Sequence, residues 1–354
     1  MSLPHDWATR ALRAADPETA HDAALRALEL GLGPRLRNDR WPQLRTSLAG
    51  LDLPNPIGLA AGFDKNARAP DAMLAAGFGF VECGTVTPLA QTGNPKPRLF
   101  RLAADRGVIN RMGFNNAGLQ AFVMRLQARA GRGGVVGANV GANKDSANRV
   151  ADYVTGLIAV YPYASYVTAN ISSPNTPGLR GLQEKGALEE LLGHLREVKK
   201  GLEREHGAKP LFLKVAPDLD DQAILDIVEL SIQYSLDALI VSNTTVQRFG
   251  IMKSRHRNET GGLSGRPLFI PSTDVLRRFA RALDGRIPLI GVGGVVDGAT
   301  ALGKIKAGAS AVQLYTALAL EGPGLLRRLL RNLAARLEAE GFKRVSEAVG
   351  ADLR

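Results

Sequence analysis

The stretch LIGVGGVVDGATALGKIKAGASAVQLYT, residues 289–316, contains a complete strand–helix–strand unit and decides the fold class. A short apolar run at 289–292 leads into a glycine-rich turn, a helical stretch follows, and a second apolar run occupies 311–314. Short runs of Val, Ile, Leu and Ala that alternate with helical stretches predict βαβ units and a parallel sheet.

The same alternation extends through most of the chain. Candidate strands occur at residues 57–61, 80–84, 135–138, 166–169, 211–214, 238–241, 289–292 and 311–314. Helical stretches follow them, for example 219–234, whose first turn is acidic, and 273–283. This repetition predicts an α/β protein with a closed (β/α)8 barrel, or TIM barrel, in preference to a doubly wound sheet. Residues 98–110 interrupt the alternation and are expected to form an inserted β-hairpin.

The composition excludes several other classes of protein. The chain has 354 residues, of which 45% are hydrophobic and 22% charged, so disorder, collagen and coiled coil are excluded. Cys83 has no second cysteine to pair with, and no Cys or His cluster has metal-binding spacing, so a reducing compartment and no metal are expected. We expect Cys83 to be a small buried side chain on the second strand. The charge-free run 153–179 contains three prolines and is expected to be a helix end, a strand and a loop, not a membrane span.

The net charge of +11 comes mainly from two interior segments. Residues 98–132 contain 7 basic residues and 1 acidic residue, and residues 245–290 contain 9 basic and 3 acidic residues. Aromatic residues make up only 5% of the chain, and no recognition module for nucleic acid is present. We therefore expect no nucleic-acid partner; anionic small molecules or an anionic membrane surface fit the charge better.

Polar residues or glycines occur at the end of every candidate strand, which is where barrels of this kind carry their chemistry. These residues are Ala61, Gly62, Asp64 and Lys65; Thr85; Asn139; Asn170, Ser172, Ser173 and Asn175; Lys214; Ser242, Asn243 and Thr244; Gly293 and Gly294; and Tyr315 and Thr316. The turn 291–294 lets backbone N–H groups approach an anion closely, which predicts a phosphate site there with Tyr315 and Thr316. Two lysines and several amides suit an organic phosphate cofactor and a planar anionic substrate.

Seven motifs along the chain resemble those of one enzyme family. They are AAGFDKN from residue 60, GTVTP from 84, NRMGFNN from 110, NISSPNTPGLR from 170, SNTT from 242, GGLSGRP from 261 and LYTAL from 314. Together and in this order they resemble the membrane-associated, quinone-dependent (class 2) dihydroorotate dehydrogenases. The resemblance implies an enzyme that oxidises (S)-dihydroorotate to orotate in the de novo synthesis of pyrimidines (UMP), with hydride transfer to FMN and electron transfer to a membrane quinone.

The resemblance also implies roles for individual residues. Ser173 matches the catalytic base, which is a cysteine in class 1 enzymes, and Thr176 with a water is a candidate proton relay. The residues implied for FMN are Ala61, Gly62, Phe63, Asp64, Lys65, Thr85, Asn139, Asn170, Lys214, Ser242, Gly265, Gly294, Tyr315 and Thr316. Those implied for dihydroorotate are Lys65, Asn110, Arg111, Met112, Gly113, Phe114, Asn170, Asn175, Asn243 and Thr244.

The N-terminal residues are expected to serve the quinone. By resemblance, 1–45 form a helical extension that rests on the membrane and makes the quinone tunnel, and 46–354 form the FMN-binding barrel. Residues 7–14 and 16–30 can form two short helices, the second capped by Asp16 and begun by Pro17. The residues that match positions near the quinone head group are His21, Arg101 and Tyr315. The expected location is peripheral, on the cytoplasmic face of the cell membrane, and a monomer is expected.

Two alternatives remain open from the sequence. The first is a class 1 type dihydroorotate dehydrogenase that passes electrons to fumarate or to NAD. The second is a non-catalytic barrel that acts as a basic binding protein. A flavin spectrum in the purified protein would exclude the second alternative.

Overall fold

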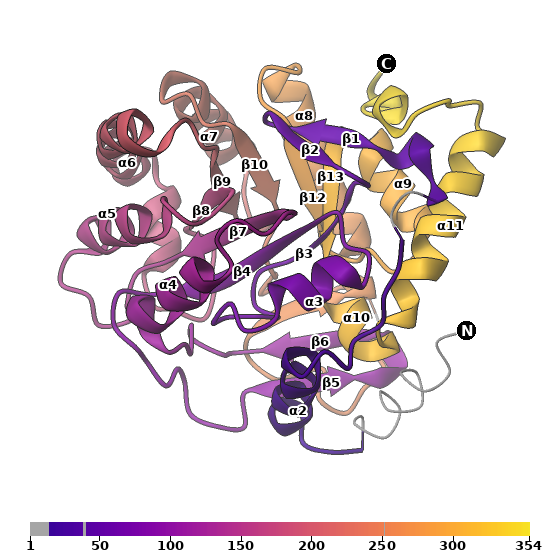
Figure 1. Ribbon diagram of the computed structural model, residues 1–354, viewed down its shortest axis with the longest axis horizontal. Coiled ribbons are helices and arrows are strands. Elements are labelled where there is room, and N and C mark those ends of the chain that lie inside the picture. Colours follow the sequence, from indigo (N-terminus) through magenta and orange to yellow (C-terminus); the bar gives the residue numbers. More distant parts are fainter. Residues whose placement is uncertain (1–13, 38–39, 251) are drawn as a thin grey trace.

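A closed barrel of eight parallel strands, surrounded by helices, forms the body of the molecule in the computed structural model, which describes residues 14–37, 40–250 and 252–354 (Figure 1). Its strands are β3 (Ile57–Leu59), β4 (Phe80–Val86), β7 (Val135–Val140), β8 (Tyr166–Asn170), β9 (Leu211–Val215), β10 (Ala238–Val241), β12 (Leu289–Val292) and β13 (Ala309–Leu314). β13 pairs with β3 and closes the barrel. The predicted (β/α)8 barrel and all eight of its predicted strands are confirmed.

Helices follow the strands and cover the outside of the barrel. They are α3 (Pro70–Ala75), α4 (Gly118–Ala128), α5 (Arg149–Val160), α6 (Lys185–His206), α7 (Asp221–Gln233), α8 (Phe269–Leu283), α9 (Gly298–Lys306), α10 (Thr316–Glu321) and α11 (Gly324–Ala339). α7 matches the predicted helix at 219–234, and the Asp220 side chain accepts a hydrogen bond from Ala223 N at 2.8 Å at its first turn. α8 begins before the predicted residue 273 because Pro271 is tolerated in a first helical turn.

A short hairpin closes the N-terminal end of the barrel. It consists of β1 (Thr46–Leu48) and β2 (Leu51–Leu53), which pair antiparallel. Leu48 and Leu53 pack with Phe80, Tyr166 and Phe212 in a small core inside the barrel. The local sequence pattern does not predict this hairpin. It leaves the opposite, C-terminal end of the barrel for the site.

The inserted hairpin is part of a three-stranded sheet. β5 (Leu99–Leu102) and β6 (Gly107–Asn110) form the predicted hairpin. A third strand, β11 (Gly262–Gly265), pairs antiparallel with β6. The glycine-rich sequence of β11 lacks the alternation that indicates a strand, and it was not predicted. The pairing joins the two basic segments found in the sequence, because β6 lies in the first and β11 in the second.

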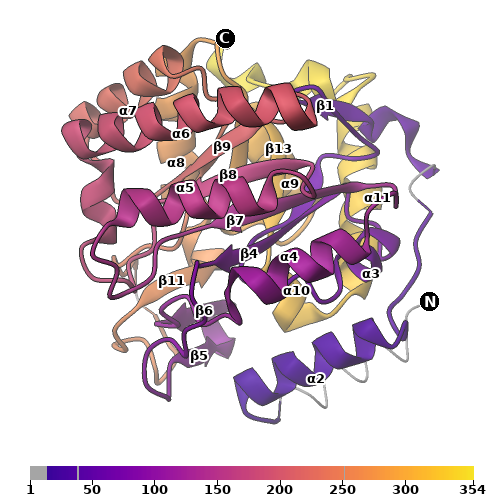
Figure 2. The same cartoon turned by 60° about the vertical axis from the view of Figure 1, so that its left-hand side comes forward.

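One N-terminal helix, α2 (Pro17–Glu29), runs beside the hairpin sheet and α3 (Figure 2). The Asp16 side chain accepts a hydrogen bond from Thr19 N at 3.0 Å and Pro17 starts the helix, as predicted for the second N-terminal helix. The helix predicted at 7–14 lies outside the described residues, except for its last residue. Arg98 Nη2 pairs with Glu18 Oε2 at 2.8 Å, and Arg68 Nη2 pairs with Glu29 Oε2 at 2.6 Å, so α2 is held at both ends.

The charge-free run at 153–179 folds as predicted into the end of α5, strand β8 and a loop. Among the helices in the described ranges, none combines the length and apolar character needed to cross a membrane.

A buried carboxylate connects several strands inside the barrel. Glu82 on β4 is fully buried, and Oε1 accepts a hydrogen bond from Asn139 Nδ2 at 2.7 Å. Oε2 accepts hydrogen bonds from the Tyr166 hydroxyl at 3.1 Å, Thr168 Oγ1 at 3.2 Å and Gln313 Nε2 at 3.0 Å. One side chain therefore satisfies donors from β7, β8 and β13.

We expect Glu82→Ala to lower the free energy of unfolding by at least about 3 kcal/mol, because it leaves four buried donors without their acceptor. Tyr166→Phe removes only one of these hydrogen bonds and should cost about 1 kcal/mol. Urea unfolding followed by circular dichroism measures both losses. Equal losses for the two variants would show that Glu82 does not organise the barrel interior.

Candidate active site

A large cavity of about 690 Å³ lies at the C-terminal ends of the barrel strands. Its walls come from the strand ends, the hairpin sheet and α2. The volume falls in the range of sites that bury a drug-sized ligand or cofactor.

Most residues predicted for the site line this cavity. They are Ala61, Gly62, Phe63, Asp64, Lys65, Thr85, Asn110, Met112, Gly113, Phe114, Asn170, Ser173, Asn175, Lys214, Ser242, Asn243, Thr244, Gly265, Gly294, Tyr315 and Thr316, together with His21 and Arg101. The structure thus brings together residues from segments far apart in the sequence. Ser172, predicted from its place at a strand end, is not part of the cavity wall, and among the residues assigned to a ligand the exceptions are Arg111 and Asn139.

Those two residues lie behind the wall. Arg111 Nη1 donates to Glu259 Oε2 at 2.8 Å, and its guanidinium lies over the Phe100 ring. Asn139 Oδ1 accepts a hydrogen bond from Thr85 Oγ1 at 2.6 Å. Asn139 can therefore act on a ligand only through Thr85. The Asp64 carboxylate is also occupied, because it accepts hydrogen bonds from the backbone N–H groups of residues 68 and 69.

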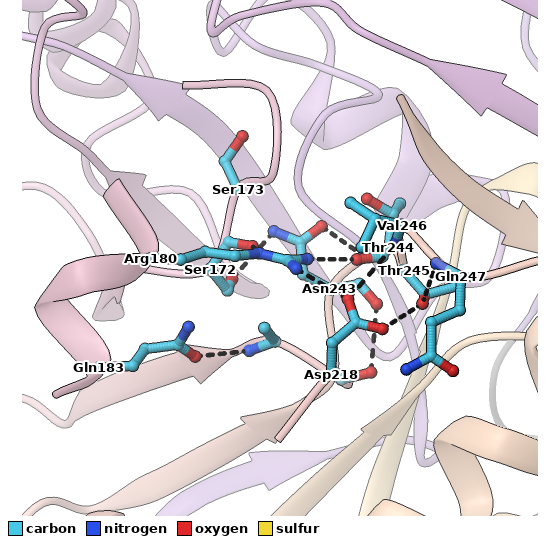
Figure 3. Close-up of polar contacts among 12 residues, drawn as sticks. Ser172, Ser173, Arg180, Gln183, Asp218, Asn243, Thr244, Thr245, Val246 and Gln247 are labelled. Carbon is cyan, nitrogen blue, oxygen red and sulfur yellow. Dashed lines mark hydrogen bonds and ion pairs between the residues drawn. The ribbon is translucent and has the colours of Figure 1, made fainter. Parts of the chain in front are cut away.

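The loop after β8 presents two adjacent serines in different ways. Ser172 Oγ donates to Asn170 Oδ1 at 2.7 Å and accepts from Asn243 Nδ2 at 2.9 Å, so its hydroxyl is used within the protein. Ser173 points away from this cluster (Figure 3) and lines the cavity. Its Oγ accepts a hydrogen bond from Asn175 N at 3.3 Å, which leaves the hydroxyl proton available to a ligand. Thr176 Oγ1 is buried and makes no hydrogen bond with any described residue.

Two lysines, Lys214, which is buried, and Lys65, which is partly exposed, give the polar end of the cavity its charge. Burial lowers the pKa of Lys65 to about 7; the Arg98 charge also lowers it, and Glu18 opposes the shift. Lys65 Nζ donates to the Asn115 side chain. Burial also lowers the pKa of Lys214, against an opposing effect of Glu82. Because burial disfavours each ammonium, an anionic ligand that restores the charge would bind strongly.

The predicted phosphate loop fits closely against α8. Gly294 has φ +75°, and a Cβ added there would lie 2.4 Å from Phe269 Cα, so only glycine fits without a shift. Ser272 Oγ donates to Leu268 O at 2.6 Å, lies 3.2 Å from Gly293 O, and accepts a hydrogen bond from Lys304 Nζ at 2.6 Å. Lys304 is fully buried, and its burial lowers its pKa well below the usual value. This lysine supports the loop from behind.

Sequence reasoning missed the residues that support the wall from behind. Glu82, Lys304 and Ser272 each lie inside an element whose pattern indicates only a core strand or helix. Asn115 could have been found, because it is the next-to-last residue of the NRMGFNN motif.

The end of the cavity beneath α2 contains an aromatic cluster, and charged side chains of α2 and the hairpin sheet, such as Glu18 and Arg101, also line this region. The distance from His21 Nε2, on α2, to Phe63 O is 2.7 Å. Burial lowers the pKa of the His21 imidazole to about 4. The imidazole is therefore neutral near pH 7 and donates its Nε2 hydrogen to this carbonyl. The His21 ring meets those of Phe63 and Tyr315 at centroid distances of 5.0 and 6.1 Å. Burial raises the pKa of Tyr315 to about 12, so its hydroxyl stays protonated.

Fold and site together define a (β/α)8-barrel protein with one cavity of two characters, polar and lysine-containing at one end and aromatic at the other. The family model described as dihydroorotate dehydrogenase matches residues 43–337. The chain belongs to the dihydroorotate dehydrogenase family, in its quinone-dependent, class 2 branch.

Similar proteins support this assignment over nearly the whole chain. The dihydroorotate dehydrogenase (quinone) of Parvibaculum lavamentivorans is 54% identical and covers 96% of this chain and 95% of its own. That of Erythrobacter litoralis is 52% identical, with 97% and 98% covered. The crystal structure of DHODH from Eimeria tenella in complex with ferulenol matches with a TM-score of 0.91 and 41% identity over 96% of both chains.

The family consists of flavoenzymes, which generates a prediction for the glycine loop. Gly294→Ala should leave the protein folded but greatly reduce bound flavin, because the new methyl group displaces the backbone against Phe269. Absorbance of bound flavin per mole of purified protein measures the effect. Gly201→Ala is the matched control, since Gly201 lies within α6 and its added Cβ would meet no atom within 4 Å. Full flavin content in Gly294→Ala would contradict a role for this loop.

Proposed function

We propose that this protein oxidises (S)-dihydroorotate to orotate in pyrimidine synthesis, with FMN as its cofactor and a membrane quinone as the electron acceptor. The observation that carries the proposal is the cavity that joins Ser173 and the two lysines to the aromatic cluster beneath α2, in which His21 is neutral. An anionic substrate fits the first end and a neutral planar acceptor fits the second.

The residues present fit FMN. The Lys214 ammonium is buried, and no described residue accepts a hydrogen bond from it, so it is available to a ligand that gathers negative charge. The tight turn at Gly294 and the backbone at Gly265, Tyr315 and Thr316 suit its phosphate. Bound FMN would supply the hydride acceptor and the route for electrons to the quinone. The residues proposed for the flavin ring are Ala61, Gly62, Phe63, Asp64, Lys65, Thr85, Asn170, Lys214 and Ser242, with Asn139 acting through Thr85.

Amides and one lysine would bind dihydroorotate. Lys65 is proposed to bind the carboxylate, and the amides of Asn110, Asn175 and Asn243 to bind the ring carbonyl and N–H groups. Asn175 Nδ2 donates to Asn110 Oδ1 at 3.2 Å, which orients both amides towards the same space. The other residues proposed for this ligand are Met112, Gly113, Phe114, Asn170 and Thr244, with Arg111, which is outside the cavity wall, acting only through its neighbours.

Ser173 is proposed to remove the proton from C5 of the substrate. A serine hydroxyl is a weak base, so the step requires exclusion of water and an acceptor for the hydroxyl proton. Ser173 is 5% exposed, and the nearby Thr176 Oγ1 is buried without a partner among the described residues. That hydroxyl is free to pass the proton on through a water.

Residues 1–45 are proposed to form the quinone tunnel and a peripheral contact with the cytoplasmic face of the membrane, in a monomeric protein. The α2 wall of the cavity supports this proposal. His21 and Tyr315 line that wall, and Arg101 Nη1 donates to Ala15 O at 2.8 Å beside it.

A visible spectrum tests the proposed reaction. The flavin bands of the purified protein should bleach with dihydroorotate and return with a quinone, and Ser173→Ala should slow bleaching about 100-fold or more because the base is lost. Stopped-flow absorbance measures both half-reactions. A colour restored by fumarate or NAD, and not by quinone, would favour the class 1 alternative; a rate for Ser173→Ala close to wild type would exclude this base.

The affinity for orotate should depend on pH through Lys65. With a pKa of about 7, the amine of the free protein is mostly neutral above that pH, whereas a bound carboxylate favours the ammonium. Binding above pH 7 then requires proton uptake, so the dissociation constant should rise by up to about tenfold per pH unit and stay flat below pH 7. Titrations between pH 6 and 8.5 measure this dependence. Lys65→Met should bind weakly at every pH, and a flat wild-type profile would contradict the assignment.

A further inference from the structure

Arg180 connects three loops at the mouth of the barrel (Figure 3). Its Nε donates to Ser172 O at 3.1 Å, in the loop after β8. Nη1 donates to Asp218 Oδ2 at 2.8 Å, in the loop after β9, and Nη2 donates to Thr244 O at 3.0 Å, in the loop after β10. The three contacts point in different directions from one planar group.

Asp218 holds the third loop from the other side. Its Oδ1 accepts a hydrogen bond from Thr245 Oγ1, and Oδ2 accepts one from Val246 N at 3.3 Å as well as the contact with Arg180. The two side chains are 24% and 13% exposed, so water competes little with this ion pair. Neither residue lines the cavity.

The two carbonyl contacts of Arg180 lie next to residues of the proposed reaction. Ser172 O belongs to the peptide bond that leads into Ser173, the proposed base. Thr244 O belongs to the residue that follows Asn243, whose amide is proposed to bind the substrate. Asn243 Nδ2 also donates to Ser172 Oγ at 2.9 Å, so the same two loops meet a second time.

We propose that the Arg180–Asp218 pair is a positioning unit that sets the distance between Ser173 and the substrate amide segment 243–244. The inference rests on the proposed function, and it assigns neither residue a contact with substrate. A lysine could not replace Arg180, because one ammonium on a flexible stem cannot direct donors to three separated acceptors.

Positioning should affect the proton transfer more than binding. A weak base such as serine is effective only at close range, and a displacement of about 1 Å can cost about 100-fold in rate. Ligand affinity depends also on Lys65, Asn110 and Asn175, which the pair does not contact. A loosened pair should therefore slow removal of the C5 proton while orotate still binds.

Arg180→Lys in the flavin-loaded protein tests the inference. At saturating dihydroorotate, the rate of flavin bleaching should fall about 100-fold, while the orotate dissociation constant stays near the wild-type value. Substrate deuterated at C5 should show a larger isotope effect than with wild type, and substrate deuterated at C6 should not. A wild-type rate, or equal losses of rate and orotate affinity, would overturn the proposal.

Asp218→Asn and a control complete the design. Asp218→Asn keeps an acceptor for Arg180 but removes the negative charge of that partner. Bleaching should therefore slow by a smaller factor than in Arg180→Lys, while the orotate dissociation constant again stays near the wild-type value. This variant provides the test if Arg180→Lys does not fold. Arg129→Lys is the matched control: Arg129 is 7% exposed and its Nη2 bonds Asp71 and Gly133 O at 3.1 Å, away from the site. The bleaching rate of Arg129→Lys should equal that of wild type. If Arg129→Lys slowed bleaching as much as Arg180→Lys does, the proposal would be overturned.

The two proposals fail differently. If dihydroorotate does not bleach the wild-type protein, the proposed function is wrong. If wild type is active and Ser173→Ala is slow, but Arg180→Lys reacts at the wild-type rate, only the positioning role is wrong.

Discussion

Closure of the barrel by the pairing of β13 with β3 is the constraint on which the rest of the structure depends. Because all eight strands are parallel, closure places every C-terminal strand end on one rim. Lys65, which follows the first barrel strand, and Tyr315, which follows the last, then line the same cavity. The hairpin β1–β2 fills the opposite end, and the large cavity lies at this rim.

The rim accommodates charged groups that are costly to bury. Burial lowers the pKa values of Lys65, Lys214 and Lys304; the first two line the cavity, whereas Lys304 stands behind the glycine loop. For Lys214, Glu82 offsets part of this cost from the barrel interior, where four donors fix its carboxylate. Such fixed charges need little rearrangement when a ligand arrives, which is the usual basis of electrostatic catalysis.

Hydrogen bonds connect the N-terminal helix with the serine loop. Arg98 pairs with Glu18 on α2, and its Nη1 donates to Asn94 O at 2.8 Å. Asn94 Nδ2 in turn donates to Asn175 O at 3.1 Å, two residues beyond Ser173. The two ends of the cavity are thus parts of one supported structure, and the Arg180–Asp218 pair supports the serine loop from the other side.

Local pattern was enough to determine the eight strands, their surrounding helices, the inserted hairpin and the cap of α2. Strand and helix periodicity and turn residues are properties of neighbouring residues, so they can be read along the chain. Most residues chosen by the strand-end rule and the family motifs also line the cavity, because position at a strand end determines which side of the barrel a residue reaches.

Only the tertiary structure decided which side chains face the cavity and which stand behind it. Asn139 and Ser172 lie at strand ends as Asn170 and Ser173 do, yet their polar atoms are used by Glu82, Thr85 and Asn243. The pairing of β11 with β6 joins residues about 150 positions apart, and the sequence of β11 has no alternation of apolar and polar residues that would reveal a strand. Arg180, Asp218 and Lys304 show the same limit: a hydrogen bond between distant loops depends on where the closed barrel places them, which neighbouring residues do not encode.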